Sequence, residues 1–159
     1  MNQTDNRKLI YPLIQWMIRR DMPSVLAIEN ECFEFPWSEE EFIRCLRQRN
    51  CIGMVAKLPD EQIIGYMVYL LEPKRLDVLS LAVDPAFQRR GVGRAMIEKL
   101  MGKLSEQRRN RLTVMVRESN LNAQLFCRAV GMQCKEIVRE AYSANDEDGY
   151  LFTKRVRGE

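Results

Sequence analysis

The sequence predicts a mixed α/β fold, in which helices pack on a sheet built from hairpins and from strands joined by helices. Apolar runs rich in β-branched residues alternate with segments whose apolar residues recur every three or four positions. Two of these runs, residues 51–58 and 63–71, are separated only by the polar turn PDEQ and predict a β-hairpin. Alternating strands and helices combined with hairpins are typical of a mixed sheet.

The N-terminal half is expected to begin with a strand at residues 12–18. A helix at residues 22–32 follows, which we expect Asp21 to cap, with Pro23 in its first turn. Residues 38–41, SEEE, have the S-x-x-E spacing of a capping box and predict the start of a second helix.

The C-terminal half continues the alternation after a strand at residues 75–84. A helix from about Gly91 to Arg109 is predicted by apolar residues at every fourth position: Val92, Met96, Leu100 and Leu104. A strand at residues 111–117 and a short helix ended by Gly131 come next. Two final strands complete the predicted order βααβββαβαββ, at residues 134–142 and 150–156. We expect one domain over residues 1–159, with residues 1–8 as a loose polar tail.

Composition excludes several classes of protein. The chain is 46% hydrophobic and 30% charged, which supports a globular core, and its net charge of +3 is too small and dispersed to predict nucleic-acid binding. No run of 18 apolar residues and no signal-peptide pattern is present, so we expect no membrane association. The five cysteines form no C-x-x-C pair, which predicts reduced thiols in the cytoplasm and no metal site. The sequence has no histidine, the commonest general base.

The stretch FQRRGVGRAM predicts an anion site at the start of a helix. The first N–H groups of a helix lack intrahelical partners, and the helix dipole adds positive charge there. Gly91 and Gly93 have no Cβ, so a ligand can approach the backbone, and Arg89, Arg90 and Arg94 add charge that suits a pyrophosphate. The alternative is that the glycines only permit a tight turn and the arginines are solvated.

The stretch LSLAVDPAFQRRGVGRAMIEKLM resembles motif A of the GNAT superfamily of acyl-CoA-dependent N-acyltransferases. The segments ENECFEFPWSEEEF, VRESN, AVGM and VREAY…DEDGYLF resemble the RimI type, the ribosomal-protein alanine N-acetyltransferases. The resemblance covers residues 14–153. It implies the GNAT fold and transfer of acetyl from acetyl-CoA, the co-substrate, to the α-amine of a protein or peptide, a ribosomal protein being one candidate.

The resemblance also assigns residues to the acetyl-CoA site. The backbone of Leu81, Ala82 and Val83 would pair with the pantetheine arm. The pyrophosphate would be held by the loop and first helical turn, made of Arg89, Arg90, Gly91, Val92, Gly93 and Arg94. Asn120 would reach the cofactor from a neighbouring strand–helix junction, although it could serve only as a turn or cap residue.

The sequence departs from the RimI type at both acid–base positions. The family glutamate is replaced by Met115, and the family tyrosine by Cys127. Three alternatives stay open: Asp77 acts as base, Cys127 protonates or hydrogen-bonds the leaving thiolate, or water takes the proton while the protein positions the reactants. Glu118 is a weaker candidate for the base, because its one-residue offset turns it to the other face of the strand.

On the acceptor side, the resemblance places four aromatic residues in the cleft: Phe35, Trp37, Tyr142 and Tyr150. Glu34 and the acidic residues Asp146–Asp148 could attract a cationic amine. The alternative is hydrophobic packing for FPWS and simple solvation for the loop.

Two other functions stay open on the sequence alone. One is a small-molecule amine acetyltransferase. The other is a non-catalytic acetyl-CoA-binding regulatory module, which the residues at positions 115 and 127 motivate. The expected oligomeric state is a monomer or a weak dimer.

Overall fold

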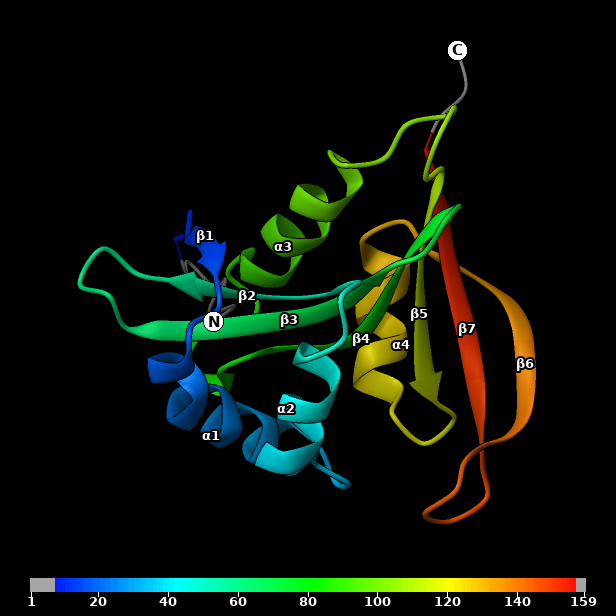
Figure 1. Ribbon diagram of the computed structural model, residues 1–159, viewed down its shortest axis with the longest axis horizontal. Helices are drawn as coiled ribbons and strands as arrows, with labels where there is room; N and C mark the ends of the chain where they lie inside the picture. The colour runs from blue at the N-terminus through cyan, green and yellow to red at the C-terminus, as the bar shows by residue number, and fades with distance from the viewer. Residues whose placement is uncertain (1–7, 157–159) are drawn as a thin grey trace, which may run out of the picture. The chain divides into compact units, whose positions relative to one another are not determined.

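The fold was analysed on a computed structural model, which describes residues 8–156. Figure 1 shows its helices and strands. The strands are β1 (Leu13–Trp16), β2 (Cys51–Lys57), β3 (Ile63–Leu71), β4 (Arg75–Val83), β5 (Arg111–Arg117), β6 (Gln133–Tyr142) and β7 (Glu147–Arg155). The α-helices are α1 (Met22–Cys32), α2 (Glu39–Leu46), α3 (Val92–Met101) and α4 (Leu121–Ala129). The predicted order βααβββαβαββ is confirmed.

Local signals in the sequence located several element ends correctly. Ser38 caps α2, since its Oγ accepts a hydrogen bond from the Glu41 N–H across 3.2 Å. Gly131, just after α4, has a φ of 88°, the left-handed conformation that glycine adopts without strain. The predicted strand 111–117 matches β5 at both ends.

Three predictions about elements were wrong in detail. The helix expected to reach Arg109 ends at Met101, where Gly102 follows and the Lys103 N–H bonds three residues back to the Leu100 carbonyl. Asp21 is the N-cap residue of α1, as predicted, but its side chain makes no capping hydrogen bond; instead its Oδ2 accepts from the Ile18 N–H of the preceding 3₁₀ turn across 2.9 Å. The first strand is shorter than expected at both ends, because only Leu13–Trp16 pairs with β2.

The sheet is mixed, as predicted. Its strand order is β1-β2-β3-β4-β5-β7-β6. The β4–β5 pair is parallel, whereas the pairs β1–β2, β5–β7 and β6–β7 are antiparallel. Contacts divide the chain into two compact units: Met1–Val68 with Ser80–Glu98, and Tyr69–Leu79 with Lys99–Glu159. The boundary runs through β3, β4 and α3. The expected single domain stays a prediction, and the expected tail at residues 1–8 lies, apart from Lys8, outside the described residues.

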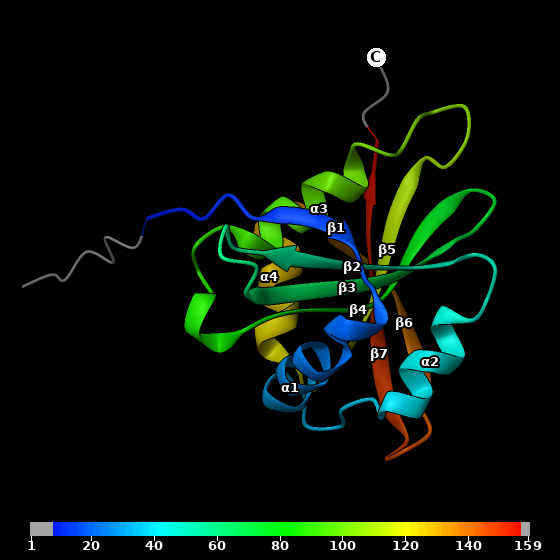
Figure 2. The same cartoon turned by 60° about the vertical axis from the view of Figure 1, so that its left-hand side comes forward.

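In the first unit, helices cover both faces of the sheet (Figures 1 and 2). Tyr66 of β3 faces α2, where its ring meets Phe42 edge-on with centroids 5.7 Å apart. The neighbouring residue Gly65 faces α3, because a Cβ there would lie 3.2 Å from the Met96 side chain. The alternation of successive strand residues between faces explains this division.

A buried carboxylate lies in the core of the first unit. The side chain of Glu29 on α1 is enclosed, with the residue only 2% exposed. Tyr66 Oη donates to Glu29 Oε2 across 2.8 Å, and Ser80 Oγ lies 3.4 Å from Oε1. A further hydrogen bond comes from the Trp37 backbone, and desolvation still raises the pKa of Glu29. This cluster joins α1, the segment before α2, β3 and β4 by polar contacts.

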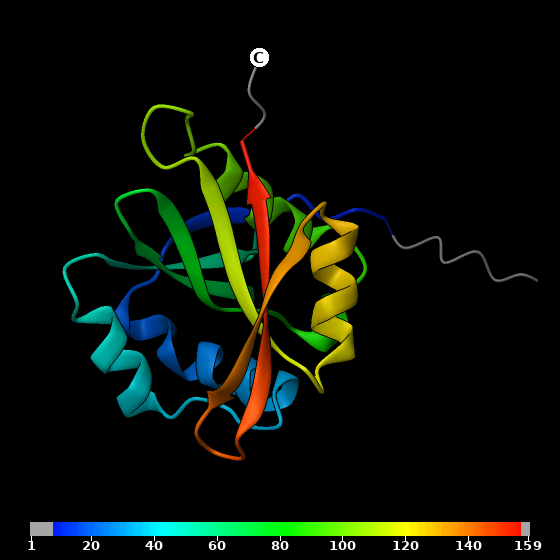
Figure 3. The same ribbon diagram turned by 90° about the vertical axis from the view of Figure 1, so that its right-hand side faces the viewer.

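In the second unit, β7 lies between β5 and β6, and α4 runs beside them (Figure 3). Tyr150 pairs with Val116 and Phe152 with Val114, so these side chains share one face. Tyr150 and Phe152 line a groove together with residues of α4, which places α4 on that face. The opposite face of β5 carries Thr113, Met115 and Arg117.

Within residues 8–156, no helix has the length and apolar character that crossing a membrane requires.

Candidate active site

The loop before α3 has the shape expected of an anion site. Arg89 and Gly91 adopt positive φ values of 62° and 86°, which turn the chain sharply before the helix begins at Val92. The Ala95 N–H donates a hydrogen bond to the Gly91 carbonyl across 3.0 Å. The backbone N–H groups of residues 92–94 therefore belong to the first turn of the helix. Glycine adopts the positive φ at position 91 without strain. Arg89 adopts its own positive φ at a cost in backbone energy, because it has a Cβ.

The N-terminal segment lies against this loop. The Ile10 N–H donates to the Arg90 carbonyl across 2.8 Å, and Arg90 Nε donates to the Lys8 carbonyl across 3.0 Å. A Cβ at Gly91 would lie 3.1 Å from a methyl of Leu9. Arg90 is thus hydrogen-bonded to the N-terminal segment, a contact that no local sequence pattern indicated.

The strand expected to pair with pantetheine alternates between half-exposed and buried residues. Leu81 and Val83 are half-buried, whereas Ala82 is 6% exposed. The Val83 carbonyl accepts hydrogen bonds from Gln88 Nε2 across 2.9 Å and from the Cys32 thiol across 3.3 Å. These contacts hold the end of β4 in place, just before the segment that leads to the Arg89–Gly91 loop.

Asn120 is the N-cap of α4. Its Oδ1 accepts a hydrogen bond from the Ala123 N–H across 3.1 Å. The alternative that Asn120 serves as a cap residue is therefore supported, and its side-chain carbonyl already has a backbone hydrogen-bond partner.

Asp77 lies directly opposite Thr113 in the parallel β4–β5 pair. Thr113 Oγ1 donates to Asp77 Oδ1 across 3.0 Å. Partial burial raises the pKa of Asp77, and the Thr113 hydrogen bond opposes that rise. A carboxyl group with a raised pKa is suited to accepting a proton near neutral pH.

Met115 shares a face of β5 with Thr113, two residues away. Its side chain lies over Gly149 of β7: a Cβ at that glycine would be 2.6 Å from Met115 Sδ and 3.0 Å from the Ala141 Cβ. The position of the family glutamate is therefore filled by a thioether, next to the Asp77–Thr113 pair.

The remaining acid–base candidates differ in exposure. Cys127 on α4 is 3% exposed, and burial raises the pKa of its thiol to about 12. Its thiol is therefore protonated at neutral pH and can offer a hydrogen bond through its S–H. Glu118 is exposed just beyond β5, where its N–H bonds to the Asp148 carbonyl.

The predicted acceptor residues do not all gather in one place. The Trp37 ring packs edge-on against Phe42 with centroids 5.0 Å apart, while Phe35 is 38% exposed. Tyr142 on β6 lies under the Arg117 guanidinium, whose carbon is 4.0 Å from the ring centroid. Tyr150 lies on the opposite face of the sheet, in the groove beside α4. The structure thus associates Tyr142, and not Tyr150, with the Met115 face.

Two acidic side chains of the loop between β6 and β7 and the start of β7 already have hydrogen-bond or ion-pair partners. Glu147 accepts from the Ser119 N–H and from Arg117, and Asp148 pairs with Arg139 across 2.8 Å. Hydrogen bonds from Ser119 lower the pKa of Glu147 to about 2. Of the four acids predicted to attract the amine, Glu147 and Asp148 therefore have cationic or backbone partners already.

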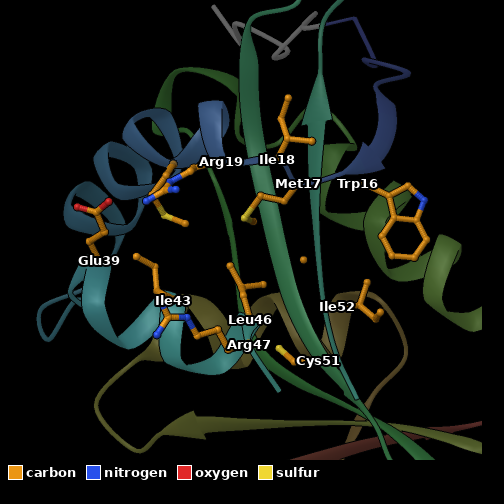
Figure 4. Close-up of a pocket in the computed structure, with 12 residues that line it drawn as sticks. Trp16, Met17, Ile18, Arg19, Glu39, Ile43, Leu46, Arg47, Cys51 and Ile52 are labelled. Atoms are coloured by element: carbon orange, nitrogen blue, oxygen red, sulfur yellow. The ribbon is translucent and has the colours of Figure 1, made fainter. Parts of the chain in front are cut away.

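A separate apolar pocket of about 430 Å³ lies in the first unit (Figure 4). Ile43 and Leu46 of α2 line one side, and Trp16 and Ile52 line the other. None of the residues predicted to bind cofactor or acceptor lines it. Among the described residues, no group of three or more acidic, cysteine or histidine side chains could hold a metal ion.

The sequence analysis did not single out Thr113 or Arg117, and it offered Glu147 only as one of the loop acids. Arg117 was visible only as part of the VRESN motif. The partners of its guanidinium, Tyr142, Asn145 and Glu147, lie 25 or more positions away in sequence, so no local pattern could have indicated these contacts.

The sequence profile of the Acetyltransferase (GNAT) family matches residues 22–132, more than half of the chain, and this range includes the loop before α3. The chain belongs to the acetyltransferase (GNAT) family. The predicted family and fold are confirmed by this match.

Within the GNAT family, the chain is similar to several N-terminal acetyltransferases. The ribosomal protein bS18-alanine N-acetyltransferase of Salmonella typhimurium is 31% identical over 123 residues, covering 77% of this chain and 81% of that protein. The Escherichia coli ribosomal-protein-S18-alanine N-acetyltransferase has a similar fold, with a TM-score of 0.78, 24% identity and coverage of 94% and 96%. Arabidopsis thaliana NAA60 in complex with acetyl-CoA gives a TM-score of 0.76 at 16% identity, covering 92% and 100%.

Proposed function

We propose that this protein transfers acetyl from acetyl-CoA to the N-terminal α-amine of a protein or peptide. The observation that carries the proposal is the strained loop Arg89–Gly91 at the start of α3, within the family match. The bS18-alanine acetyltransferase relatives support a ribosomal protein as acceptor, and the NAA60 complex supports acetyl-CoA as co-substrate.

The phosphate loop would hold the pyrophosphate of acetyl-CoA. Backbone N–H groups of Val92 and Gly93 belong to the first turn of α3, where N–H groups have no intrahelical acceptor, so they can donate to phosphate oxygens. Arg89 would add charge. The backbone of Leu81–Val83 would pair with the pantetheine amides. Asn120 caps α4 through its Oδ1, and its contact with the cofactor stays a prediction.

Asp77 is our candidate for the general base. The acceptor ammonium must lose a proton before its nitrogen attacks the thioester carbonyl carbon. As the N–C bond forms, the C–S bond breaks and the thiolate takes up a proton. The Asp77 carboxylate, oriented by the Thr113 hydroxyl, can accept the amine proton directly or through one water. Burial raises the pKa of the Cys127 thiol to about 12, so Cys127 is a candidate only for a hydrogen bond to the leaving sulfur, and the proton released by the amine, carried by Asp77 or water, returns to that sulfur.

The acceptor would contact Phe35, Trp37 and Tyr142, whose apolar rings suit the first residues of a peptide. Tyr150 lies in the groove beside α4, on the face opposite Met115, and is not among the proposed acceptor contacts. The five cysteines are all free thiols, which supports the cytoplasm as the compartment.

The cofactor part is tested by the melting temperature with and without CoA. A ligand at about 100 times its dissociation constant stabilises by about 2.7 kcal/mol, so a clear rise is expected. Gly91→Asp should abolish that rise, because it adds a side chain and a negative charge at φ 86°. Gly131→Asp is the matched control, with the same change at φ 88°, and should keep it. An unchanged melting curve with CoA in the wild-type protein would refute the proposal.

The acceptor part is tested by thiol release from acetyl-CoA. The expected substrate is a decapeptide with a free N-terminal alanine, and the same peptide with a blocked N-terminus should be inert. Release with spermidine but not with the peptide would favour a small-molecule amine acetyltransferase. CoA binding without release for any amine would favour a regulatory module.

A further inference from the structure

The hairpin of β6 and β7 is fastened to the turn between β5 and α4 by two side chains. Arg117, the last residue of β5, donates to Glu147 Oε1 across 3.2 Å and to Asn145 Oδ1 across 3.1 Å. Glu147 Oε2 accepts from the Ser119 N–H across 2.6 Å. One carboxylate therefore joins the hairpin to both the end of β5 and the start of the following turn.

The same arginine also holds an aromatic ring. Its guanidinium carbon lies 4.0 Å from the centroid of the Tyr142 ring, within the range of a cation–π contact. Tyr142 pairs with Glu147 in the β6–β7 register. The ring and the carboxylate thus belong to paired residues, and both contact the Arg117 guanidinium at the base of the hairpin loop.

These contacts are sheltered, which separates them from an ordinary surface ion pair. The side chains of Arg117 and Glu147 are 19% and 10% exposed, whereas Arg139, which pairs with Asp148 on the same hairpin, is 79% exposed. An exposed pair contributes little, because water screens it and holding long side chains costs entropy. A sheltered, multiply bonded guanidinium positions its neighbours more strongly.

The hairpin needs such fastening. The β6–β7 register shifts between Val138 and Tyr142, and the strand bends where Glu140 adopts a φ of 52°. A second positive φ, 54°, occurs at Asp146 in the loop. Because the ladder is irregular on the approach to Tyr142, backbone pairing alone does not fix the orientation of that ring.

We propose that Arg117 is a positioning residue for acceptor recognition: it holds the Tyr142 ring and, through Glu147, the β6–β7 hairpin in the geometry that receives the acceptor. This inference rests on the proposed function, in which Tyr142 contacts the acceptor. It assigns to Arg117 no contact with the reacting atoms and none with acetyl-CoA.

The proposal is tested by steady-state kinetics with acetyl-CoA and the decapeptide that has a free N-terminal alanine. Arg117→Gln should raise the KM for the peptide about tenfold, the size expected for losing a charged hydrogen bond, and leave the KM for acetyl-CoA within about twofold. Arg117→Lys keeps a cation over the ring and should recover part of the loss. Arg139→Gln, the matched exposed pair, should change neither KM by more than about twofold.

A second readout does not depend on catalysis. The Ser119 amide donates to Glu147, so its hydrogen exchange should accelerate in Glu147→Gln and in Arg117→Gln, but not in Arg139→Gln. Equal increases in both KM values, or no change in either, would overturn the proposal. If the wild-type protein acetylates no peptide, the proposed function fails, and unchanged Ser119 exchange in both variants would then overturn the positioning role as well.

Discussion

The side chain of Met115 lies against the backbone of Gly149 on the neighbouring strand. A Cβ at Gly149 would come within 2.6 Å of Met115 Sδ and 3.0 Å of its Cγ. The two residues are therefore coupled: glycine on β7 makes room for the thioether on β5. Because Met115 stands where the RimI type has a glutamate, this coupling concerns the local shape of the candidate site.

Gly149→Ala is expected to destabilise the protein by about 1 kcal/mol, because the added methyl forces Met115 to move. In a Met115→Ala background the same substitution should cost clearly less, since only the contact with Ala141 at 3.0 Å persists. Urea unfolding of the four proteins in this double-mutant cycle measures the coupling. Additive effects would contradict it.

Asp77→Asn should lower the turnover number by about 100-fold if Asp77 is the base. Met115→Glu, which puts a carboxylate on the same face two residues from Thr113, should restore part of the activity of this variant. Asp60→Asn, in the exposed turn after β2, is the control and should be neutral. A turnover number unaffected by Asp77→Asn would point to water as the proton acceptor.

The same substitution makes a prediction about stability and pH. Burial raises the pKa of Asp77 in the folded protein, so folding disfavours its ionised form. That penalty is present above the folded pKa and disappears as the pH falls towards the unfolded value of about 3.9. Asp77→Asn should therefore be more stable than the wild type at pH 7, and the difference should vanish in acid. Urea unfolding at pH 7 and pH 4 measures it; a deficit at pH 7 would be the contrary result.

Cys127→Tyr, which restores the family tyrosine, is expected to destabilise the protein by about 1–3 kcal/mol. Cys127 is 3% exposed, so a phenol ring has to displace its neighbours. Cys134→Tyr on the exposed edge of β6 is the matched control and should change the stability little. If Cys127→Tyr were as stable as the wild type, the site would already have space for the ring.

Glu29→Ala should destabilise the protein by about 3 kcal/mol, because it leaves the Tyr66 and Ser80 hydroxyls and the Trp37 N–H without their acceptor. Glu31→Ala, two residues away on the exposed side of α1, should stay within about 0.5 kcal/mol of the wild type. Equilibrium unfolding in urea compares the two. Similar values for both variants would show that the buried cluster contributes nothing specific.

Much of the fold could be predicted because its signals are local. The capping box at Ser38, the left-handed Gly131 and the apolar repeat of α3 each depend on residues within a turn or two of one another. The same holds for the phosphate loop, whose glycines and arginines are contiguous. The end of α3 was missed because the apolar repeat extends to Leu104 although the helix ends before Gly102.

By itself, the sequence determined the element order, the family and the position of the candidate anion site, since each is written in short contiguous patterns. Only the tertiary structure decided that Glu29 is buried under Tyr66, that Lys8 bonds to Arg90, and that Arg117 holds Tyr142. It also placed Tyr142 and Tyr150 on opposite faces of the second unit. The three contacts lie between residues that are 25 to 82 positions apart in sequence. Packing and strand register bring such residues together, and no local periodicity encodes either.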